Sequence, residues 1–361
     1  MTHAAEIPRP QSAAAAIEIT RATPSEARDW DRYVENHSEG GFFHLFGWGE
    51  VIETAYGYAP HYLIARRAGK IVGVVPVVDV KAPLLGRSFI STAFTVGGGP
   101  IGDDDAVVTK LAEAVAEAGE AQGVRYIEFR SGETTLGGWR QKTGAYANFA
   151  MALPGDEEDH LGLIRRRRRA EIRKALAAEA AGQLSLRLDG DADEFYRFYA
   201  TSLRNHGTPV FPRRFLDALL RVFAGKTEIS VVEVNGAPAA ALLSFRFKNS
   251  YLPYYVGATA LARGARAHEY HYWKLMRLCV ERGIERFDFG RSKIDTGPYR
   301  FKKLWGAEPI PITYQYKLIA AREVPNINPK NPKFETLTKL WRRLPLPVAN
   351  ALGPMLARNF P

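Results

Sequence analysis

One order of predicted elements occurs twice in this chain, and this repeat limits the fold more than any other feature of the sequence. Each copy has a hairpin, a third strand, a loop, a helix and a returning strand, as hydrophobic spacing and turn residues indicate. The first copy comprises hairpin 61–78, strand 88–94, loop 97–102, helix 106–122 and strand 124–129. The second comprises hairpin 229–247, strand 251–256, loop 257–267, helix 268–282 and strand 284–289. The closing units, Gly-Val-Arg-Tyr-Ile-Glu-Phe and Gly-Ile-Glu-Arg-Phe-Asp-Phe, are recognisably the same.

In both copies, antiparallel strands lead through a glycine-containing loop into a helix, whose N-terminus offers unpaired N–H groups and the positive end of a dipole. This arrangement resembles the GNAT acyltransferase sheet. We therefore expect an α/β (α+β) fold with two tandem GNAT-like domains and mixed, mainly antiparallel sheets. The usual (Gln/Arg)-x-x-Gly-x-(Gly/Ala) signature is absent from both loops, so the sequence supports the fold better than it supports acetyl-CoA binding. The expected segments are a disordered leader (1–16), domain 1 (17–160), domain 2 (161–320, beginning with a basic linking helix over 161–181) and a tail (321–361).

Length and charge limit the partners. A chain of 361 residues can form two domains with real cores, and its net charge of +10 favours an anionic partner. The single cysteine, Cys279, excludes an internal disulfide, and the start lacks the apolar core of a signal peptide. With no run apolar enough to span a bilayer, we expect a cytoplasmic protein.

The segment 339–360 alternates basic, aromatic and apolar residues. It is either a tail that packs on the body or a peripheral contact with the anionic surface of the inner membrane.

The predicted helix Leu161–Ala181 contains five consecutive arginines, Arg165 to Arg169. Five positions at about 100° each go fully round a helix, so these arginines cannot share one solvent face. Arg168 falls on the apolar stripe between Ile164 and Ile172 and must snorkel, pair or meet a ligand. A solvated basic face and an anion-binding face are therefore both open interpretations of this helix.

A second basic segment lies between two strand-like runs, Arg286–Phe289 and Ile312–Leu318. It contains Arg291, Lys293, Arg300, Lys302 and Lys303. A short connection with five cations and few acids is typical of a site for an anion.

These segments together resemble the Fem-type (FemAB) peptidyltransferases, in the branch associated with PEP-CTERM/exosortase and exopolysaccharide systems, with BioF2-like acyltransferase domains. The resemblance covers roughly residues 17–318. It rests on a helix motif of the form Lys-x-Arg-x-x-Ile-Arg-Lys-Ala, a late Asp-Phe-Gly…Phe-Lys…Gly motif and the segment 201–209. The helix motif is present as Arg167, Arg169, Ile172, Arg173, Lys174 and Ala175, with arginine in place of the first lysine. The late motif is present as Asp288-Phe-Gly-Arg-Ser292, Gly297-Pro-Tyr-Arg-Phe-Lys302 and Trp305-Gly306.

The resemblance implies amide-bond formation: an amine on an anionic, sugar-linked envelope or exopolysaccharide precursor attacks an acyl ester or thioester. It implies that Lys302 stabilises the negative charge on the carbonyl oxygen, and that the donor is aminoacyl-tRNA or acyl-CoA, with no tightly bound cofactor. The residues expected to bind substrate are Arg167, Arg169, Arg173, Arg204, Asn205, His206, Arg291, Ser292, Tyr299, Arg300 and Phe301.

The reaction also needs a base to take a proton from the amine. Candidates are Asp288, Tyr254, Tyr255 and His206, and the sequence does not select among them; we carry Asp288 and Tyr255 forward as catalytic residues. A Tyr-Tyr pair is more often part of a core rim than a proton carrier. Arg204-Asn205-His206-Gly207 is either a helix end with a glycine cap or a substrate clamp in which Arg204 binds a phosphate.

Other classes of function fit less well. His37, His44 and His61 have no metal-ligand spacing, and Cys279 has no partner base. The charge suits a nucleic acid, but no DNA- or RNA-binding module is visible, so we expect no DNA partner and RNA contact only through a tRNA donor. The main alternative is a non-catalytic binding or scaffold protein of an exopolysaccharide or protein-sorting system at the inner membrane.

Overall fold

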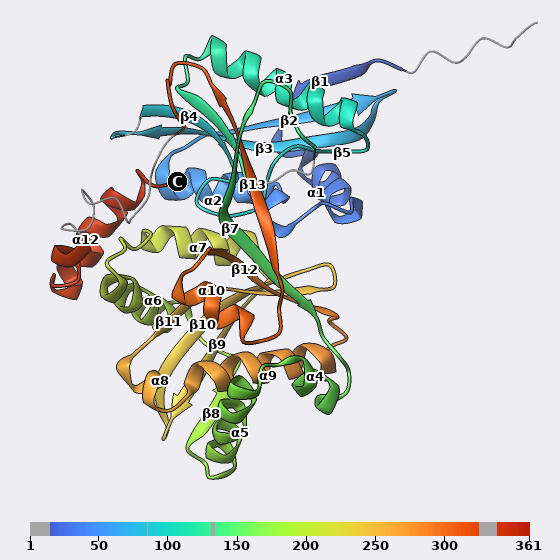
Figure 1. The fold of residues 1–361 in the computed structure, drawn as a ribbon. Coiled ribbons are helices and arrows are strands. Elements are labelled where there is room, and N and C mark those ends of the chain that lie inside the picture. The colour runs from blue at the N-terminus through green and yellow to red at the C-terminus, as the bar shows by residue number, and fades with distance from the viewer. Residues whose placement is uncertain (1–14, 85, 131–133, 325–337) are drawn as a thin grey trace, which may run out of the picture.

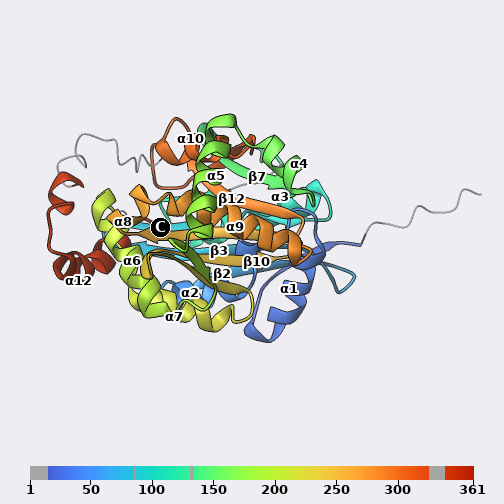
Figure 2. The same cartoon turned by 90° about the horizontal axis from the view of Figure 1, so that it is seen from below.

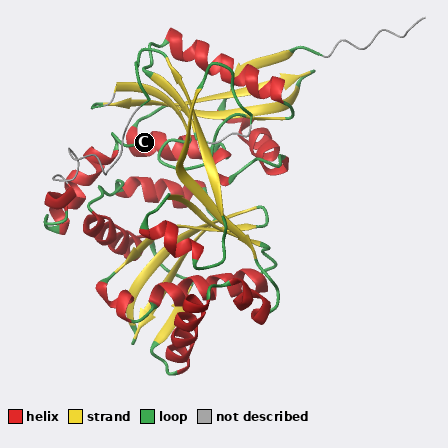
Figure 3. Ribbon diagram, in the orientation of Figure 1, coloured by secondary structure: helices red, strands yellow, loops and turns green. Residues whose placement is uncertain are grey.

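The computed structural model describes residues 15–84, 86–130, 134–324 and 338–361. It is a mixed α/β protein, as the sequence predicts (Figure 3). The strands are β1 (Ile17–Arg21), β2 (Pro60–Arg67), β3 (Lys70–Ala82), β4 (Gly86–Ser91), β5 (Ile101–Gly102), β6 (Tyr126–Phe129), β7 (Arg140–Ala152), β8 (Leu184–Arg187), β9 (Thr227–Val234), β10 (Ala237–Phe247), β11 (Ser250–Ala258), β12 (Arg286–Lys293) and β13 (Pro309–Leu318). The α-helices are α1 (Ala27–Asn36), α2 (Gly47–Tyr56), α3 (Asp105–Ala121), α4 (Glu157–Leu163), α5 (Arg166–Ala180), α6 (Ala192–His206), α7 (Arg213–Val222), α8 (Ala260–Gly264), α9 (Ala267–Glu281), α10 (Gly297–Lys303) and α12 (Leu346–Ala357).

The repeat found in the sequence is present and longer than predicted. β2-β3-β4-α3-β6 and β9-β10-β11-α9-β12 follow the same order, and each copy is preceded by a strand and two helices (β1, α1, α2 and β8, α6, α7). In both copies the third strand and the returning strand pair in parallel, whereas the hairpins are antiparallel. The sheet is therefore mixed and mainly antiparallel, which confirms the predicted fold class.

The two copies share one 13-stranded sheet, in the order β1-β2-β3-β4-β6-β13-β7-β12-β11-β10-β9-β8, with β5 beside β3. β7 follows the first copy in sequence but pairs with β12 of the second, and β13 follows the second copy but pairs with β6 of the first. β7 and β13 also pair with each other, and they run diagonally through the middle of Figure 1. The division at residue 160 stays a prediction. By sequence β7 belongs to the first copy and β13 to the second, but by strand pairing each also belongs to the other copy, so the sheet has no single boundary there.

Helices cover both faces of the sheet (Figures 1 and 2). We call each copy of the repeat, with the strand and two helices that precede it, one half of the molecule. The largest core cluster joins α1, α2, α6 and α7 to strands of both halves, through large side chains such as Trp30, Trp48, Phe215 and Phe245. α3 packs a second cluster on the first half, and α5 and α9 pack a third and a fourth on the second. The two halves are thus held together by an aromatic interior as well as by the central strands.

Three local predictions differ from the structure. The single helix over 161–181 is wrong: Ile164 and Arg165 are extended (ψ 138° and 139°), so α4 and α5 are separate helices. Tertiary contacts explain the break, because Ile164 is buried and the N–H of Arg165 donates to the carbonyl of Leu304 at 3.1 Å. The loop 257–267 contains α8, and the basic segment between β12 and β13 contains α10. The leader, apart from residues 15 and 16, lies outside the described residues.

The tail packs on the body through one face of α12. Ala349, Gly353 and Ala357 are buried, while Leu352 and Met355 are exposed. Among the described residues, no helix is long and apolar enough to cross a membrane.

Candidate active site

The late Asp-Phe-Gly motif forms a β-bulge in β12. Opposite β7 the register shifts between Asp288, which pairs with Ala150, and Gly290, which pairs with Phe149. Gly290 has φ 70°, a left-handed conformation that favours glycine. The Asp288 carboxylate closes the bulge by accepting the Gly290 N–H at 2.8 Å, and it also accepts from the Asn148 side chain at 3.2 Å. Such a bulge changes the direction in which the backbone groups that follow it point.

Lys302 lies against this bulge. Its side chain comes from α10 and is only 9% exposed. Nζ donates to the carbonyl oxygens of Gly290 and Arg291 at 2.8 and 3.0 Å. Burial lowers the pKa of Lys302 to about 7, and the nearby charge of Asp288 opposes this shift. Lys302 is therefore a positioned amine that changes charge near neutral pH, whereas Lys303, the next residue of the same helix, is exposed.

Asp288 is the acidic partner in this site. Burial raises the pKa of its carboxyl group, and the hydrogen bonds from Gly290 and Asn148, with the charge of Lys302, act in the opposite direction. Asn148 was not predicted as a site residue. No motif marks it, because it lies on β7, whose position beside β12 follows from the crossing of the central strands.

The strands β11 and β12 separate beside the bulge. They pair in parallel only at Ser250–Arg286 and Tyr251–Phe287, and beyond these pairs each keeps only its outer neighbour. Tyr254 of β11 lies across from the bulge: its ring would lie 3.9 Å from a Cβ placed on Gly290.

Ser202 of α6 binds the far end of β11. Its hydroxyl accepts the N–H of Ala258 at 2.7 Å and contacts the Ala258 carbonyl at 3.1 Å. Because backbone groups two residues apart in a strand point the same way, the N–H and C=O of Val256 also face this gap.

The matching gap in the first half is filled by the chain itself. β4 and β6 pair only at Phe89–Ile127 and Ile90–Glu128. The glycine-rich loop then returns between them, and Gly98 and Arg130 exchange both backbone hydrogen bonds, at 3.3 and 3.1 Å. The hydroxyl of Ser91 also donates to the Gly98 carbonyl. The two halves therefore differ where they are most alike in topology: in the first half a described loop pairs with the chain beyond β6, whereas in the second no bridge is described between β11 and β12 beyond Tyr251–Phe287.

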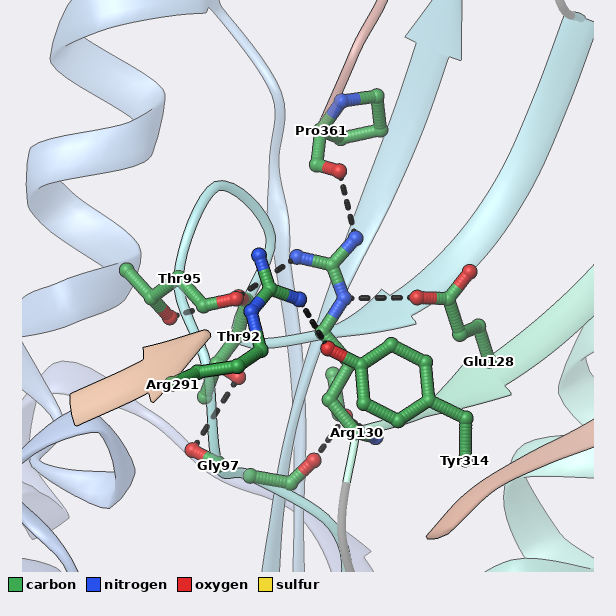
Figure 4. Close-up of polar contacts among 10 residues, drawn as sticks. Thr92, Thr95, Gly97, Glu128, Arg130, Arg291, Tyr314 and Pro361 are labelled. Atoms are coloured by element: carbon green, nitrogen blue, oxygen red, sulfur yellow. Dashed lines mark hydrogen bonds and ion pairs between the residues drawn. The ribbon is translucent and has the colours of Figure 1, made fainter. Parts of the chain in front are cut away.

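Arg291 points from the bulge towards the first half (Figure 4). Its guanidinium donates to the hydroxyl of Tyr314 on β13 and lies 4.3 Å from the ring of Tyr146 on β7. Arg130, which follows β6 and is also labelled in Figure 4, pairs with Glu128 at 2.7 Å. Arg130 was not predicted as a site residue. The repeat contains a signal for it: Arg130 follows Phe129 in the first copy just as Gly290, the residue of the bulge, follows Phe289 in the second.

The remaining residues of the late motif have separate positions. Tyr299 packs edge-on against Phe149, and the partly buried Phe301 packs against the core residue Trp305. Ser292 is buried, and Arg300 is exposed and contacts the Asp295 carbonyl at 3.2 Å. Tyr299 and Phe301 thus anchor α10 and with it Lys302.

The arginines of α5 divide into two groups. Arg168 is buried, pairs with Glu269 of α9, and stacks on the ring of Phe301 at 4.6 Å. Arg167 and Arg173 are exposed, and Arg169 makes a 3.5 Å contact with the Leu161 carbonyl. Of the three interpretations open for Arg168, pairing is the observed one. Because Arg168 stacks on Phe301, the residue before Lys302, the first turn of α5 lies next to α10.

Tyr255 and the segment 204–206 lie apart from this site. Tyr255 is buried beside Phe211, Phe215 and Phe245 and lines a small apolar cavity, so it belongs to the aromatic interior. Arg204, Asn205 and His206 end α6, where Gly207 (φ 80°) forms a left-handed cap. There Arg204 contacts the Arg342 carbonyl at 3.4 Å, and Arg342 contacts the His206 carbonyl at 3.2 Å. These residues contact the tail rather than the bulge.

No group of three or more His, Cys, Asp or Glu in the described ranges is placed to hold a metal ion. The site that the structure assembles consists of Lys302, Asp288, Asn148, the carbonyls of Gly290 and Arg291, and Tyr254, whose ring lies beside Gly290.

Comparisons with known proteins agree with this architecture. Residues 165–303, which contain α5, the gap, the bulge and Lys302, match the family model described as the acetyltransferase (GNAT) domain. No curated protein sequence is similar enough to this chain to count as a relative.

Solved structures extend the likeness to most of the chain. FemX has a TM-score of 0.64 at 14% identity, covering 82% of this chain and 96% of FemX. The C-terminal domain of a putative lysylphosphatidylglycerol synthetase from Agrobacterium fabrum has a TM-score of 0.54 at 14% identity, covering 81% and 91%. A tandem GNAT protein from the clavulanic acid biosynthesis pathway has a TM-score of 0.53 at 10% identity, covering 85% and 100%. The chain therefore has the fold of acyltransferases with two GNAT-like units.

Proposed function

We propose that this protein is an N-acyltransferase of the Fem type, which joins an acyl or aminoacyl group to an amine on an anionic, nucleotide- or lipid-linked sugar of the cell envelope or exopolysaccharide. The observation that carries the proposal is the buried Lys302, held on the carbonyls of Gly290 and Arg291 at the bulge of β12, the strand that separates from β11 in the second half. The acyltransferase fold and the GNAT match of residues 165–303 support the same reaction class.

The reaction forms one bond and breaks one. The amine nitrogen attacks the carbonyl carbon of an ester or thioester, and the tetrahedral intermediate carries a negative oxygen. Its collapse breaks the bond to the leaving alkoxide or thiolate, which takes up a proton, and the proton of the amine goes to a base. A fixed cation near the negative oxygen lowers the barrier, typically by about 3–4 kcal/mol.

Lys302 fits the role of that cation. An ammonium has three N–H donors, and two of those of Lys302 are held by backbone carbonyls. The third is available to the oxyanion. Asp288 is the base that the geometry favours over Tyr255 and His206, because burial raises its pKa and it lies near enough to Lys302 for their charges to interact. In this scheme Asn148 positions the Asp288 carboxylate.

The donor enters the gap between β11 and β12. A chain with amide groups laid along Val256 would pair with the backbone groups that face the gap, as an added strand does. GNAT acyltransferases use acyl-CoA, which fits the family match. Aminoacyl-tRNA is the other donor, and the exposed Arg167 and Arg173 of α5, next to α10, would contact its phosphates.

The protein is proposed to act in the cytoplasm at the inner membrane, which it contacts through α12. Val348, Leu352, Met355 and Leu356 are spaced along one face of this helix and are 37–67% exposed. The exposed Arg342 and Arg343 precede the helix. An apolar face beside cations suits the surface of an anionic bilayer. This same surface favours the second candidate function, a non-catalytic scaffold protein of an exopolysaccharide or protein-sorting system.

A transfer assay separates these two functions. The wild-type protein is incubated with acyl-CoA or aminoacyl-tRNA and with nucleotide-linked amino sugars, and the products are identified by mass spectrometry. A product that gains the mass of the acyl group, and that disappears with Lys302→Met while the fold is retained, supports the enzyme. Equal product from the two proteins would remove Lys302 from the mechanism, and no product with either donor would favour the scaffold.

A further inference from the structure

We propose that Arg165, at the start of α5, is a positioning residue for Lys302, and that it acts through the hydrogen bond between its backbone N–H and the carbonyl at the end of α10. The catalytic consequence of this positioning rests on the proposed function. The coupling between α5 and α10 does not, and it can be measured without any substrate.

α10 needs contacts from other elements to keep its place. It has only seven residues, Gly297–Lys303, and isolated helices shorter than about 12 residues are marginal in water. Lys302 holds one side of α10 against β12 through its two hydrogen bonds to backbone carbonyls. A single side chain does not fix the direction of a helix, so the end of α10 needs a second anchor.

Arg165 provides that anchor. Leu304, the C-cap residue of α10, accepts the N–H of Arg165 on its carbonyl oxygen at 3.1 Å. Arg165 is the N-cap residue of α5. The N–H of an N-cap residue lies outside the hydrogen-bond ladder of its own helix. It can therefore bind the exposed carbonyl at the end of another helix, and here each helix end satisfies the other.

Close packing supports this contact. Ile164, next to Arg165, is 2% exposed and belongs to the same core cluster as Trp305. Gly306 has φ 86°, and a Cβ placed on it would lie 2.4 Å from the carbonyl oxygen of Leu163. No side chain fits in that space. The linker between α4 and α5 and the residues that end α10 therefore touch backbone to backbone and cannot shift independently.

Lys302 belongs to the turn that this contact holds. Its carbonyl accepts the N–H of Trp305 at 3.0 Å, so its backbone moves with that of Leu304. A shift of the turn would pull Nζ from the two carbonyls of β12 and expose it to water. Misplacing a group in a reacting centre by about 1 Å can reduce the rate by about 10²-fold. Because burial lowers the pKa of Lys302 to about 7, this pKa also reports the position of the side chain.

Arg165→Pro removes the N–H without straining the backbone. Arg165 has φ −60° and ψ 139°, which proline adopts, and Ile164 is extended (ψ 138°), as the residue before a proline prefers. Arg165→Gln is the matched control, because it removes the same charge and keeps the N–H. Arg166→Pro is a second control: it places proline at the first residue of α5, where the N–H has no partner within the helix.

The measurement is an NMR titration of the full-length protein with isotope-labelled lysine, in which the Lys302 signal is the one missing from Lys302→Met. Arg165→Pro should raise the pKa of Lys302 from about 7 towards 10.5, because the amine gains contact with water. Both controls should keep the wild-type value. In the transfer assay, kcat of Arg165→Pro should fall at least about tenfold with KM changed less than about twofold, since substrate binding is retained.

An unchanged pKa of Lys302 in Arg165→Pro would overturn the proposal, and so would an equal rise in Arg165→Gln or Arg166→Pro. Thermal denaturation shows whether each variant is folded. If Arg165→Pro does not fold, Gly306→Ala decides the matter, because it disturbs the same contact from the other side and should raise the same pKa. Wild-type protein that transfers no acyl group would contradict the proposed function, while the pKa comparison would still decide the coupling.

Discussion

The Nζ of Lys302 lies 3.0 Å from the carbonyl oxygen of Arg291. This hydrogen bond joins the buried amine of Lys302, on α10, to β12 at Arg291. The side chain of the same Arg291 points towards the first half and contacts Tyr314 on β13. The bond exists because the bulge at Asp288–Gly290 turns two consecutive carbonyls, those of Gly290 and Arg291, towards α10. Lys302 is therefore positioned by two backbone carbonyls. Substitutions at the bulge test this positioning, and substitutions of Lys302 itself test the role of its charge.

Replacing Lys302 by methionine should reduce transfer by about 10²–10³-fold, the usual loss when one oxyanion donor is removed. Lys303→Met is the control, since Lys303 belongs to the same helix but is exposed, and it should keep nearly full activity. Initial rates and circular dichroism of both variants provide the measurement. Similar losses in the two variants would mean that α10 contributes general positive charge rather than one positioned donor.

Transfer should fall as the pH rises through about 7, because the protonated form of Lys302 stabilises the oxyanion and its pKa lies near that value. A pH profile of kcat/KM checks this expectation. A rise through pH 7 would instead assign Lys302 the role of a base.

The same pKa shift predicts how stability depends on pH. The pKa of Lys302 is lower in the folded protein (about 7) than its ordinary value of 10.5, so between these values the unfolded state binds more protons. The contribution of Lys302 to the free energy of unfolding should therefore increase with pH across this window. Denaturant titrations of wild-type and Lys302→Met protein at pH 7 and pH 10 measure it, and a difference between the two proteins that does not change with pH would contradict it.

Gly290→Ala should disturb the bulge, because a residue with a Cβ is strained by about 1–2 kcal/mol at φ 70°. Gly283→Ala offers a matched control: Gly283 has the same φ of 70° and open space around its Cβ position, but it follows α9 outside the site. We expect similar losses of stability and a loss of transfer only for Gly290→Ala. Equal activities of the two variants would show that the bulge does not position the reacting groups.

Arg168→Met should destabilise the protein by up to about 3 kcal/mol, because it leaves Glu269 without its buried partner and removes a cation from the ring of Phe301. Arg167→Met, a neighbouring exposed arginine, should change stability little. Thermal denaturation of both variants tests whether Arg168 is a structural residue. If both variants are as stable as the wild type, the ion pair contributes nothing measurable.

Changing Leu352 and Met355 together to glutamate should reduce co-sedimentation with phosphatidylglycerol vesicles at least tenfold, because it places two charges on the exposed apolar face of α12. Leu261→Glu is the control, since Leu261 is also exposed but lies on α8. Neutral phosphatidylcholine vesicles show how much of the binding is electrostatic. Wild-type protein that binds neither kind of vesicle would exclude the membrane contact.

The order of the elements, their type in most places, and the repeat can all be predicted from the amino-acid sequence. Hydrophobic spacing of 2 and 3.6 residues and turn glycines such as Gly236 are local signals, so they can be recognised without the fold. It also marked Asp288, Arg291 and Lys302 through the late motif and its resemblance to a family.

The contacts of these residues follow from the three-dimensional fold and could not be predicted from the sequence. The pairing of β7 with β12 brought Asn148 to Asp288, and the pairing of β13 with β7 brought Tyr314 to Arg291, because partners far apart in the sequence leave no periodic trace in it. The break between α4 and α5 has the same origin, since the contact of Arg165 with Leu304 outweighed the helical propensity of the arginine run. Local periodicity fixed the elements, and long-range strand pairing, with the burial that follows from it, fixed the site.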